Sequence, residues 1–266
     1  MKIGERGRGL LAACLLAGLP SFAQDDAQGL MHGVPVETKL SGPLTWGEVS
    51  LRVTLSGARA LPAFLSRRGA AAADGGVWTV DVLDAAVADE PAQPRHTKAT
   101  WVVDFDQPAF GKVWGEAVEA LGPRPAAEAV TAFVRRVLVK KDYSRGFDLA
   151  SKVAARREGD CTEHSVFLAA LLRRFGIPAR AMVGLVLLPT RGAPVAFGHM
   201  WVEARVEGRW RTFDAAVPRE ANPAYLPSGE LSDEGPGFGL TLMQRMAELD
   251  FRSIGLGARA SATGTK

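Results

Sequence analysis

The feature that most constrains the fold is a strongly apolar helix predicted between residues 159 and 178. Asp160 is a good N-cap residue, and Glu163 three positions later completes a capping-box pattern. Gly176 fits the position that follows a helix, and Pro178 prevents the helix from continuing. The apolar side chains between these signals are Val166, Leu168, Ala169, Leu171 and Leu172. A helix this apolar needs cover on most of its faces, so we expect it at the centre of a domain.

Cys161 falls at the first position of this predicted helix. There the unpaired backbone N–H groups and the positive end of the helix macrodipole favour the thiolate over the thiol. The other cysteine, Cys14, lies in an N-terminal segment that we expect to be removed, so no internal disulfide is expected. A lone cysteine can also be a small, buried and unreactive apolar residue. Its place at the helix start favours a nucleophile.

A β-hairpin is predicted after this helix. An apolar run over residues 179–188 predicts one strand, and alternation over residues 199–206 predicts a second. The pair Glu207-Gly208 predicts a tight turn, because glycine tolerates a positive φ. Residues 209–214 then form the returning strand.

The register of this hairpin decides whether a histidine and a carboxylate meet. If Val206 pairs with Arg209, His199 and Asp214 lie on the same face of the sheet, whereas a slip of one residue separates them. Taken singly, His199 is an ordinary strand histidine and Asp214 an ordinary turn residue at the end of a strand, where a carboxylate is expected to be partly solvated. Because both residues follow the capped helix that begins with Cys161, His199 and Asp214 together with this cysteine form a thiol, imidazole and carboxylate set.

Three blocks of the sequence resemble the transglutaminase-like superfamily, most closely its exported bacterial members. They are residues 159–180, the Gly-His-Met-Trp block at 198–201, and residues 208–214. The resemblance is specific over residues 155–218 and looser from about residue 100. It implies an α+β fold with a papain-like core, in which a helix bearing the cysteine packs on an antiparallel sheet. By the same resemblance, Cys161 is the nucleophile, His199 the general base and acid, and Asp214 the residue that orients the histidine.

The resemblance also implies the reaction class. A cysteine thiolate attacks an amide carbonyl of a protein or peptide, and an amine or water resolves the thioester. The outcome is crosslinking, deamidation or proteolysis. The backbone N–H of Cys161 is expected in the oxyanion hole. Animal transglutaminases use an upstream tryptophan as the second donor, but Trp114 is too far from Cys161 in the chain to match it. The alternative is a non-catalytic envelope binding module that keeps the fold.

Two further polar residues of the helix are better explained by structure than by catalysis. Glu163 fits a helix cap better than a catalytic acid. His164, three residues after Cys161, lies roughly on the same side of the helix, and a structural hydrogen bond is the favoured explanation over a place in the site. The sequence has no histidine, cysteine and acidic cluster with metal-ligand spacing and no phosphate-binding glycine loop, so we expect no metal and no cofactor.

The N-terminus predicts an export signal over residues 1–23. Lys2, Arg6 and Arg8 precede an apolar run over residues 10–19, which is too short to span a bilayer. The Ser-Phe-Ala sequence ending at Ala23 fits a cleavage site, which predicts a periplasmic or secreted protein. A lipoprotein signal ending at Cys14 is the less favoured alternative. No later apolar segment is long enough for a membrane span, so none is expected after cleavage.

The remaining chain divides into three predicted regions. A β-rich domain over 24–108 contains β-like runs at 48–56, 77–83 and 99–105. A catalytic domain over 109–225 begins with helices predicted at 126–140 and 148–157. The region 226–266 holds the end of a surface loop predicted over 222–239, a short helix over 240–251 and a frayed tail.

Charge excludes one class of partner. The net charge is only +3, from 32 basic and 29 acidic residues. Basic residues form no stripe with interleaved aromatic residues, so nucleic acid is not an expected partner.

Overall fold

The structure is a computed structural model that describes residues 34–38, 49–55, 72–74, 77–81, 90–142, 146–189, 194–247 and 251–258. The predicted signal segment, with its cleavage site after Ala23, and the frayed tail lie outside the described residues.

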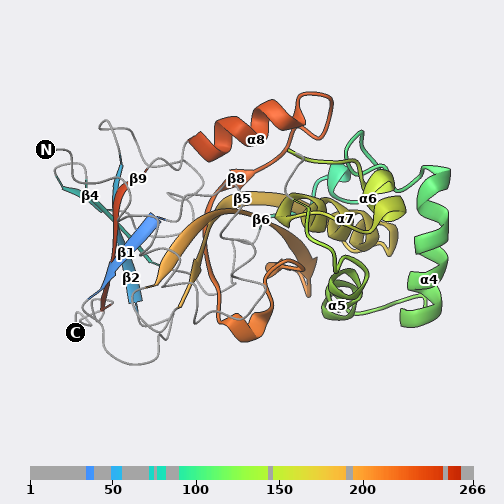
Figure 1. The fold of residues 1–266 in the computed structure, drawn as a ribbon, viewed down its shortest axis with the longest axis horizontal. Coiled ribbons are helices and arrows are strands. Elements are labelled where there is room, and N and C mark those ends of the chain that lie inside the picture. Colours follow the sequence, from blue (N-terminus) through green and yellow to red (C-terminus); the bar gives the residue numbers. More distant parts are fainter. Residues whose placement is uncertain are drawn as a thin grey trace, which may run out of the picture.

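The helices gather at one end of the molecule, except for the last (Figure 1). Helices predicted at 126–140 and 148–157 are confirmed with shorter bounds, and the helix predicted at 240–251 begins and ends earlier. Within the described residues, no helix is long and apolar enough to cross a membrane. The helices are α4 (Gly111–Leu121), α5 (Ala127–Val137), α6 (Ala150–Arg156), α7 (Cys161–Arg174) and α8 (Phe238–Ala247), with 3-10 turns η3 (Pro94–His96), η4 (Pro108–Phe110) and η5 (Arg219–Ala221).

The described strands join into one continuous, mostly antiparallel sheet. Its order is β3 (Ala72–Asp74), β4 (Val77–Asp81), β2 (Val49–Leu55), β9 (Phe251–Ala258), β1 (Val34–Thr38), β6 (Val195–Val206), β5 (Ala179–Leu188) and β8 (Ala224–Glu230). Strand β7 (Arg209–Phe213) pairs with β6, and β1 with β9 is the parallel pair among these ladders. The predicted α+β class is therefore confirmed.

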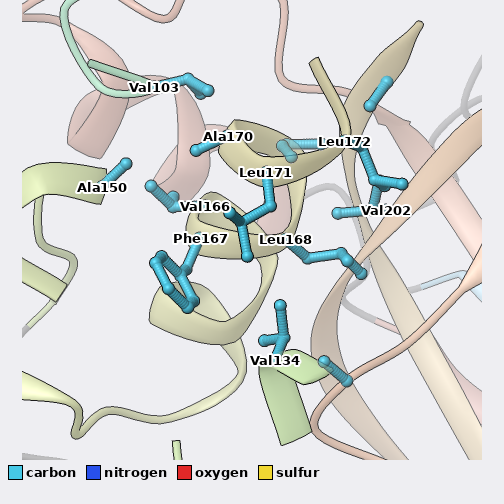
Figure 2. Close-up of a cluster of buried hydrophobic side chains, with 14 of the residues drawn as sticks. Val103, Val134, Ala150, Val166, Phe167, Leu168, Ala170, Leu171, Leu172 and Val202 are labelled. Atoms are coloured by element: carbon cyan, nitrogen blue, oxygen red, sulfur yellow. The ribbon is translucent and has the colours of Figure 1, made fainter. Parts of the chain in front are cut away.

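Helix α7 is the centre of the core, as its apolar sequence predicts. Figure 2 shows its side chains surrounded by residues from three neighbouring elements and a loop: Val134 of α5, Ala150 of α6, Val202 of β6 and Val103. Every residue from Val166 to Leu172 is fully buried. Burial on all sides fixes α7 against the sheet and so fixes the position of its first residue, Cys161.

Two predictions about irregular and strand segments are wrong. Residues 99–105 form bends and turns instead of a strand, because the segment bonds to itself: the Thr100 N–H donates to the Val103 carbonyl at 3.2 Å and the Val103 N–H to the Thr100 hydroxyl at 3.1 Å. The Val102 N–H donates to the Glu234 carbonyl at 3.0 Å, so this buried backbone group of the loop has a hydrogen-bond partner. The surface loop predicted over 222–239 contains β8, a largely buried strand that pairs with β5.

Candidate active site

The N-terminus of α7 has the cap that the sequence predicts. The Asp160 carboxylate accepts the Thr162 N–H at 2.7 Å, and the Glu163 carboxyl accepts the Asp160 N–H at 2.9 Å. These bonds fix the first turn, so Cys161 is the first helical residue and its thiol lies at the positive end of the helix. Cys161 is partly exposed, as a nucleophile must be.

Glu163 and His164 are buried beside this turn and form hydrogen bonds with its backbone. Burial, together with the nearby Asp160 carboxylate, raises the pKa of Glu163 to about 8. The His164 ring lies 2.6 Å from the Asp160 carbonyl and 3.1 Å from the Leu138 carbonyl. Burial and the positive charge of Lys141 lower the pKa of His164 to about 4. A neutral imidazole has one N–H, so His164 makes one structural hydrogen bond there, as favoured above.

The hairpin has the predicted register. Val206 pairs with Arg209, and the ladder continues to Val202 opposite Phe213. The chain leaves the ladder at Asp214, so the pairing of β6 with β7 does not extend to His199. His199 and Asp214 nevertheless meet, with the His199 Nε2 atom 2.7 Å from Asp214 Oδ2. A carboxylate only accepts hydrogen bonds, so Nε2–H is the donor, and Nδ1 is the ring nitrogen left for the thiol.

The turn after β7 orients the Asp214 carboxylate. Its Oδ1 atom accepts the backbone N–H groups of Ala216 at 2.8 Å and Val217 at 2.9 Å. The Arg135 guanidinium donates to the Asp214 carbonyl at 2.8 Å and so ties this turn to α5. Only 7% of Asp214 is exposed, which overturns the expectation of a partly solvated carboxylate. The turn folds back over the strand end and buries it.

Electrostatics favour an ion pair between the two residues. Burial alone would lower the pKa of His199, but the charge and hydrogen bond of Asp214, with a further hydrogen bond to the Cys161 thiol, raise it to about 10. Burial alone would raise the pKa of Asp214, but the His199 charge and the donors around the carboxylate lower it. The structure thus brings His199 and Asp214 into a hydrogen-bonded pair, with the Cys161 thiol near enough to the same imidazole to help raise its pKa.

Sequence reasoning missed Tyr225. Its hydroxyl donates to Asp214 Oδ2 at 2.9 Å from strand β8. Tyr225 and Asp214 both line a cavity of about 350 Å³ between α5, β7 and the chain before β8. No periodic pattern could have found Tyr225, because prolines at positions 223 and 227 obscure the strand that carries it.

Within the described part of the chain, no three or more histidine, cysteine and acidic side chains are grouped so that they could hold a metal ion. The thiol, imidazole and buried carboxylate of the site form a set suited to nucleophilic catalysis.

Comparison with known proteins finds a family model that matches the part of the chain holding this site. Residues 115–215 match the transglutaminase-like superfamily, and this range includes Cys161, His199 and Asp214. The matched part of the chain has the mixed helix and antiparallel sheet expected of a transglutaminase-like, papain-like fold. The match supports a general role as a thiol-dependent enzyme.

Two further comparisons add less. No curated protein matches the chain. A solved structure of a candidate cysteine protease from Cytophaga hutchinsonii is 15% identical, with a TM-score of 0.44, and the alignment covers 88% of this chain and 86% of that one.

Proposed function

We propose that this protein is a cysteine acyltransferase or amide hydrolase that acts on protein or peptide amides. Cys161 is the nucleophile, His199 the general base and acid, and Asp214 the residue that orients His199. The observation that supports this most directly is the buried His199–Asp214 pair, joined at 2.7 Å, with the Cys161 thiol near enough to the same imidazole to help raise its pKa. Isolated residues with only structural roles would not require this chain of contacts.

The first half of the reaction makes a thioester. The Cys161 thiolate attacks the amide carbonyl carbon, and the C–N bond breaks as the His199 imidazolium gives its proton to the leaving amine. The backbone N–H of Cys161 has no acceptor within the helix, because it belongs to the first turn, and it is available to the oxyanion. Asp214 keeps its charge throughout and stabilises the imidazolium.

The second half releases the acyl group. Neutral His199 accepts a proton from water or from an amine, whose oxygen or nitrogen attacks the thioester carbon. The C–S bond then breaks and the Cys161 thiolate returns. With a glutamine side chain as acyl donor, a lysine amine gives an isopeptide crosslink and water gives deamidation. With a peptide bond as donor, water gives proteolysis.

Export forms part of the proposal. The basic segment, apolar run and small-residue site at the N-terminus predict cleavage after Ala23 and a periplasmic or secreted enzyme. In such an oxidising compartment the mature chain keeps one thiol, and Cys161 has no internal cysteine partner. Substrates would then be envelope or extracellular proteins.

The test uses chemistry that does not depend on knowing the substrate. The purified protein is incubated with a glutamine dipeptide and hydroxylamine, and separately with an envelope extract. Mass spectrometry then follows hydroxamate, released ammonia, new isopeptide bonds and new chain termini. We expect at least one product with the wild type and none with Cys161→Ala. Products that are absent from both, or equal in both, would overturn the proposal in favour of a binding module.

A further inference from the structure

The Asp214 carboxylate accepts hydrogen bonds from four donor groups, which is as many as its two oxygens can accept. Backbone N–H groups of Ala216 and Val217 occupy Oδ1 at 2.8 and 2.9 Å. His199 and Tyr225 occupy Oδ2 at 2.7 and 2.9 Å. Three of these donors follow from the local hairpin and its turn. The fourth, Tyr225, comes from a different strand.

The sheet register places Tyr225 on the same face as His199. Tyr225 lies opposite Val186 of β5, and Val186 lies opposite Phe197 of β6, two residues before His199. The residue directly between His199 and strand β8 is Gly184. Because Gly184 has no side chain, the tyrosine can reach across β5 to the carboxylate.

Aromatic packing fixes the direction of the Tyr225 ring. Its centroid lies 4.9 Å from that of Trp201 at an interplanar angle of 46°. The His199 ring lies 6.3 Å from Trp201 at an interplanar angle of 18° and 6.4 Å from Tyr225 at 29°. The hydroxyl is therefore held at one position, and its hydrogen bond to Asp214 costs little further side-chain entropy.

The Tyr225 hydroxyl keeps its proton, and so remains a hydrogen-bond donor, over the whole pH range below its raised pKa. Burial and the neighbouring Asp214 charge raise the pKa of its phenol well above the usual value. The hydroxyl also lies where Asp214 meets the cavity of about 350 Å³ that both residues line. Without it, Oδ2 would have a free acceptor position facing space in which water fits.

We propose that Tyr225 is a positioning residue for the Cys161–His199–Asp214 site. Its hydroxyl fills the last acceptor position of Asp214 Oδ2 and leaves a single direction from which that oxygen receives the His199 Nε2–H. The imidazole is thereby held with Nδ1 toward the thiol, and cavity water is kept from the carboxylate. This inference rests on the proposed function, since it assigns Tyr225 to the same reactive site.

The test is a double-mutant cycle on thiol reactivity. Alkylation of Cys161 by iodoacetamide is measured from about pH 3 to 9, by about unit steps, for wild type, Tyr225→Phe, Asp214→Asn and the double variant. Phenylalanine keeps the ring and removes only the hydroxyl. We expect Tyr225→Phe to slow alkylation about tenfold, the scale of one lost hydrogen bond to a charged group. The acid limb of the pH profile should move to higher pH, because Asp214 loses a donor that favours its ionised form.

The Asp214→Asn background separates positioning from general packing. There Tyr225→Phe should have no further effect, because its partner has already lost the charge through which it acts. Phe197→Leu is the matched control, since Phe197 packs in the same apolar cluster as Tyr225 and has no hydroxyl. It should leave the pH profile of the folded protein unchanged.

The possible failures are distinguishable. Equal effects of Tyr225→Phe in both backgrounds, or no effect in the wild type, would overturn the role of Tyr225 while leaving the reactive site intact. If Cys161 in the His199→Ala variant is alkylated at the same rate as in the wild type, the proposed function itself fails. Circular dichroism of each variant ensures that the rates refer to folded protein.

Discussion

Gly184 lies directly opposite His199 in the β5–β6 ladder, and the site requires that position to have no side chain. A Cβ atom on Gly184 would lie 2.2 Å from the Leu226 carbonyl oxygen and 2.6 Å from the Trp201 ring. The β5–β8 register also shifts between Val183 and Gly184. The close approach of β8 at this point is what allows Tyr225 to reach Asp214.

Gly184→Ala is expected to destabilise the protein by about 1–3 kcal/mol, the usual cost of overpacking, and to slow Cys161 alkylation. Either β8 or the Trp201 ring must move, and both support the His199–Asp214 pair. Gly115→Ala is the control, because a Cβ there meets nothing within 4 Å inside helix α4. It should be neutral or stabilising by up to about 1 kcal/mol. Thermal melting and alkylation rates check both variants, and a Gly184→Ala protein with unchanged values for both would refute this packing.

A buried ion pair joins the far end of α7 to the loops beside it. The Arg173 guanidinium donates to both Glu234 oxygens at 2.7 and 2.6 Å and to the Ala179 carbonyl at 2.9 Å. Both charged side chains are almost fully buried. The same Glu234 residue also accepts the Thr100 hydroxyl, which holds the loop that replaces the predicted strand at 99–105.

Arg173→Met should lower the free energy of unfolding by about 3–5 kcal/mol, because it leaves the Glu234 charge buried without its partner. Arg211→Met is the matched control. Arg211 pairs with Glu128 at 3.5 Å, and their side chains are 40% and 49% exposed, so water screens the pair and this change should cost less than about 1 kcal/mol. Urea denaturation of the two variants measures the contrast. Similar losses for both would mean that Arg173 and Glu234 are solvated in solution.

The parts of the site that are local in sequence could be predicted. The capping box needs only residues 160–163, and the hairpin register depends on one tight turn. Glu207 and Gly208 adopt positive φ values of 51° and 77°, which fixes the predicted pairing of Val206 with Arg209. These short-range rules were enough to bring His199 and Asp214 to one face.

The parts that depend on long-range packing could not be predicted. Strand β8 is at an edge of the sheet and contains Pro227 and Gly229, residues that are poor strand formers, so its sequence resembles a loop. Tyr225 and Arg135 both support Asp214 from other elements, and neither has a local sequence signal for that role. The burial of Asp214 follows from these contacts, which is why a solvated carboxylate was expected from the hairpin alone.

Glu163 predicts an unusual pH dependence of stability. Its pKa rises from 4.5 to about 8 in the folded protein. The folded state therefore holds a proton that the unfolded state releases above pH 4.5, and the free energy of unfolding falls as the pH rises from about 4.5 to 8. Glu163→Gln keeps an acceptor for the Asp160 N–H and cannot ionise.

Glu163→Gln should consequently match the wild type near pH 4.5 and exceed it in melting temperature near pH 8. Melting curves across this range give the difference directly. Glu220→Gln, in the exposed part of η5, is the control and should show no such trend. A constant difference between Glu163→Gln and wild type at all pH values would show that Glu163 is ionised in the folded protein throughout.

The His199–Asp214 pair predicts a second loss of stability, at higher pH than the loss from Glu163. The pKa of His199 is raised from 6.5 to about 10, so its protonated form stabilises the folded state fully below about pH 6.5, and this contribution is lost as the pH rises through 10. The pKa of Asp214 is lowered, so its contribution is present above 3.8 and is lost only as the pH falls below that value. The pair therefore stabilises the protein most between these limits.

Asp214→Asn keeps the shape of the side chain but removes the charge that holds the imidazolium. We expect it to lower the free energy of unfolding by about 3 kcal/mol near pH 6, the scale for one broken partner of a buried ion pair. The loss should shrink steadily as the pH rises toward 10, because His199 then becomes neutral in the wild type as well. Cys161→Ser is the control, since it leaves the buried pair intact and should follow the wild-type curve closely. Thermal melting of the three proteins at intervals from pH 6 to about 10.5 measures both trends. A loss that stays constant over this range would mean that His199 is already neutral at pH 6, and that Asp214 acts on it as a hydrogen-bond acceptor without an ion pair.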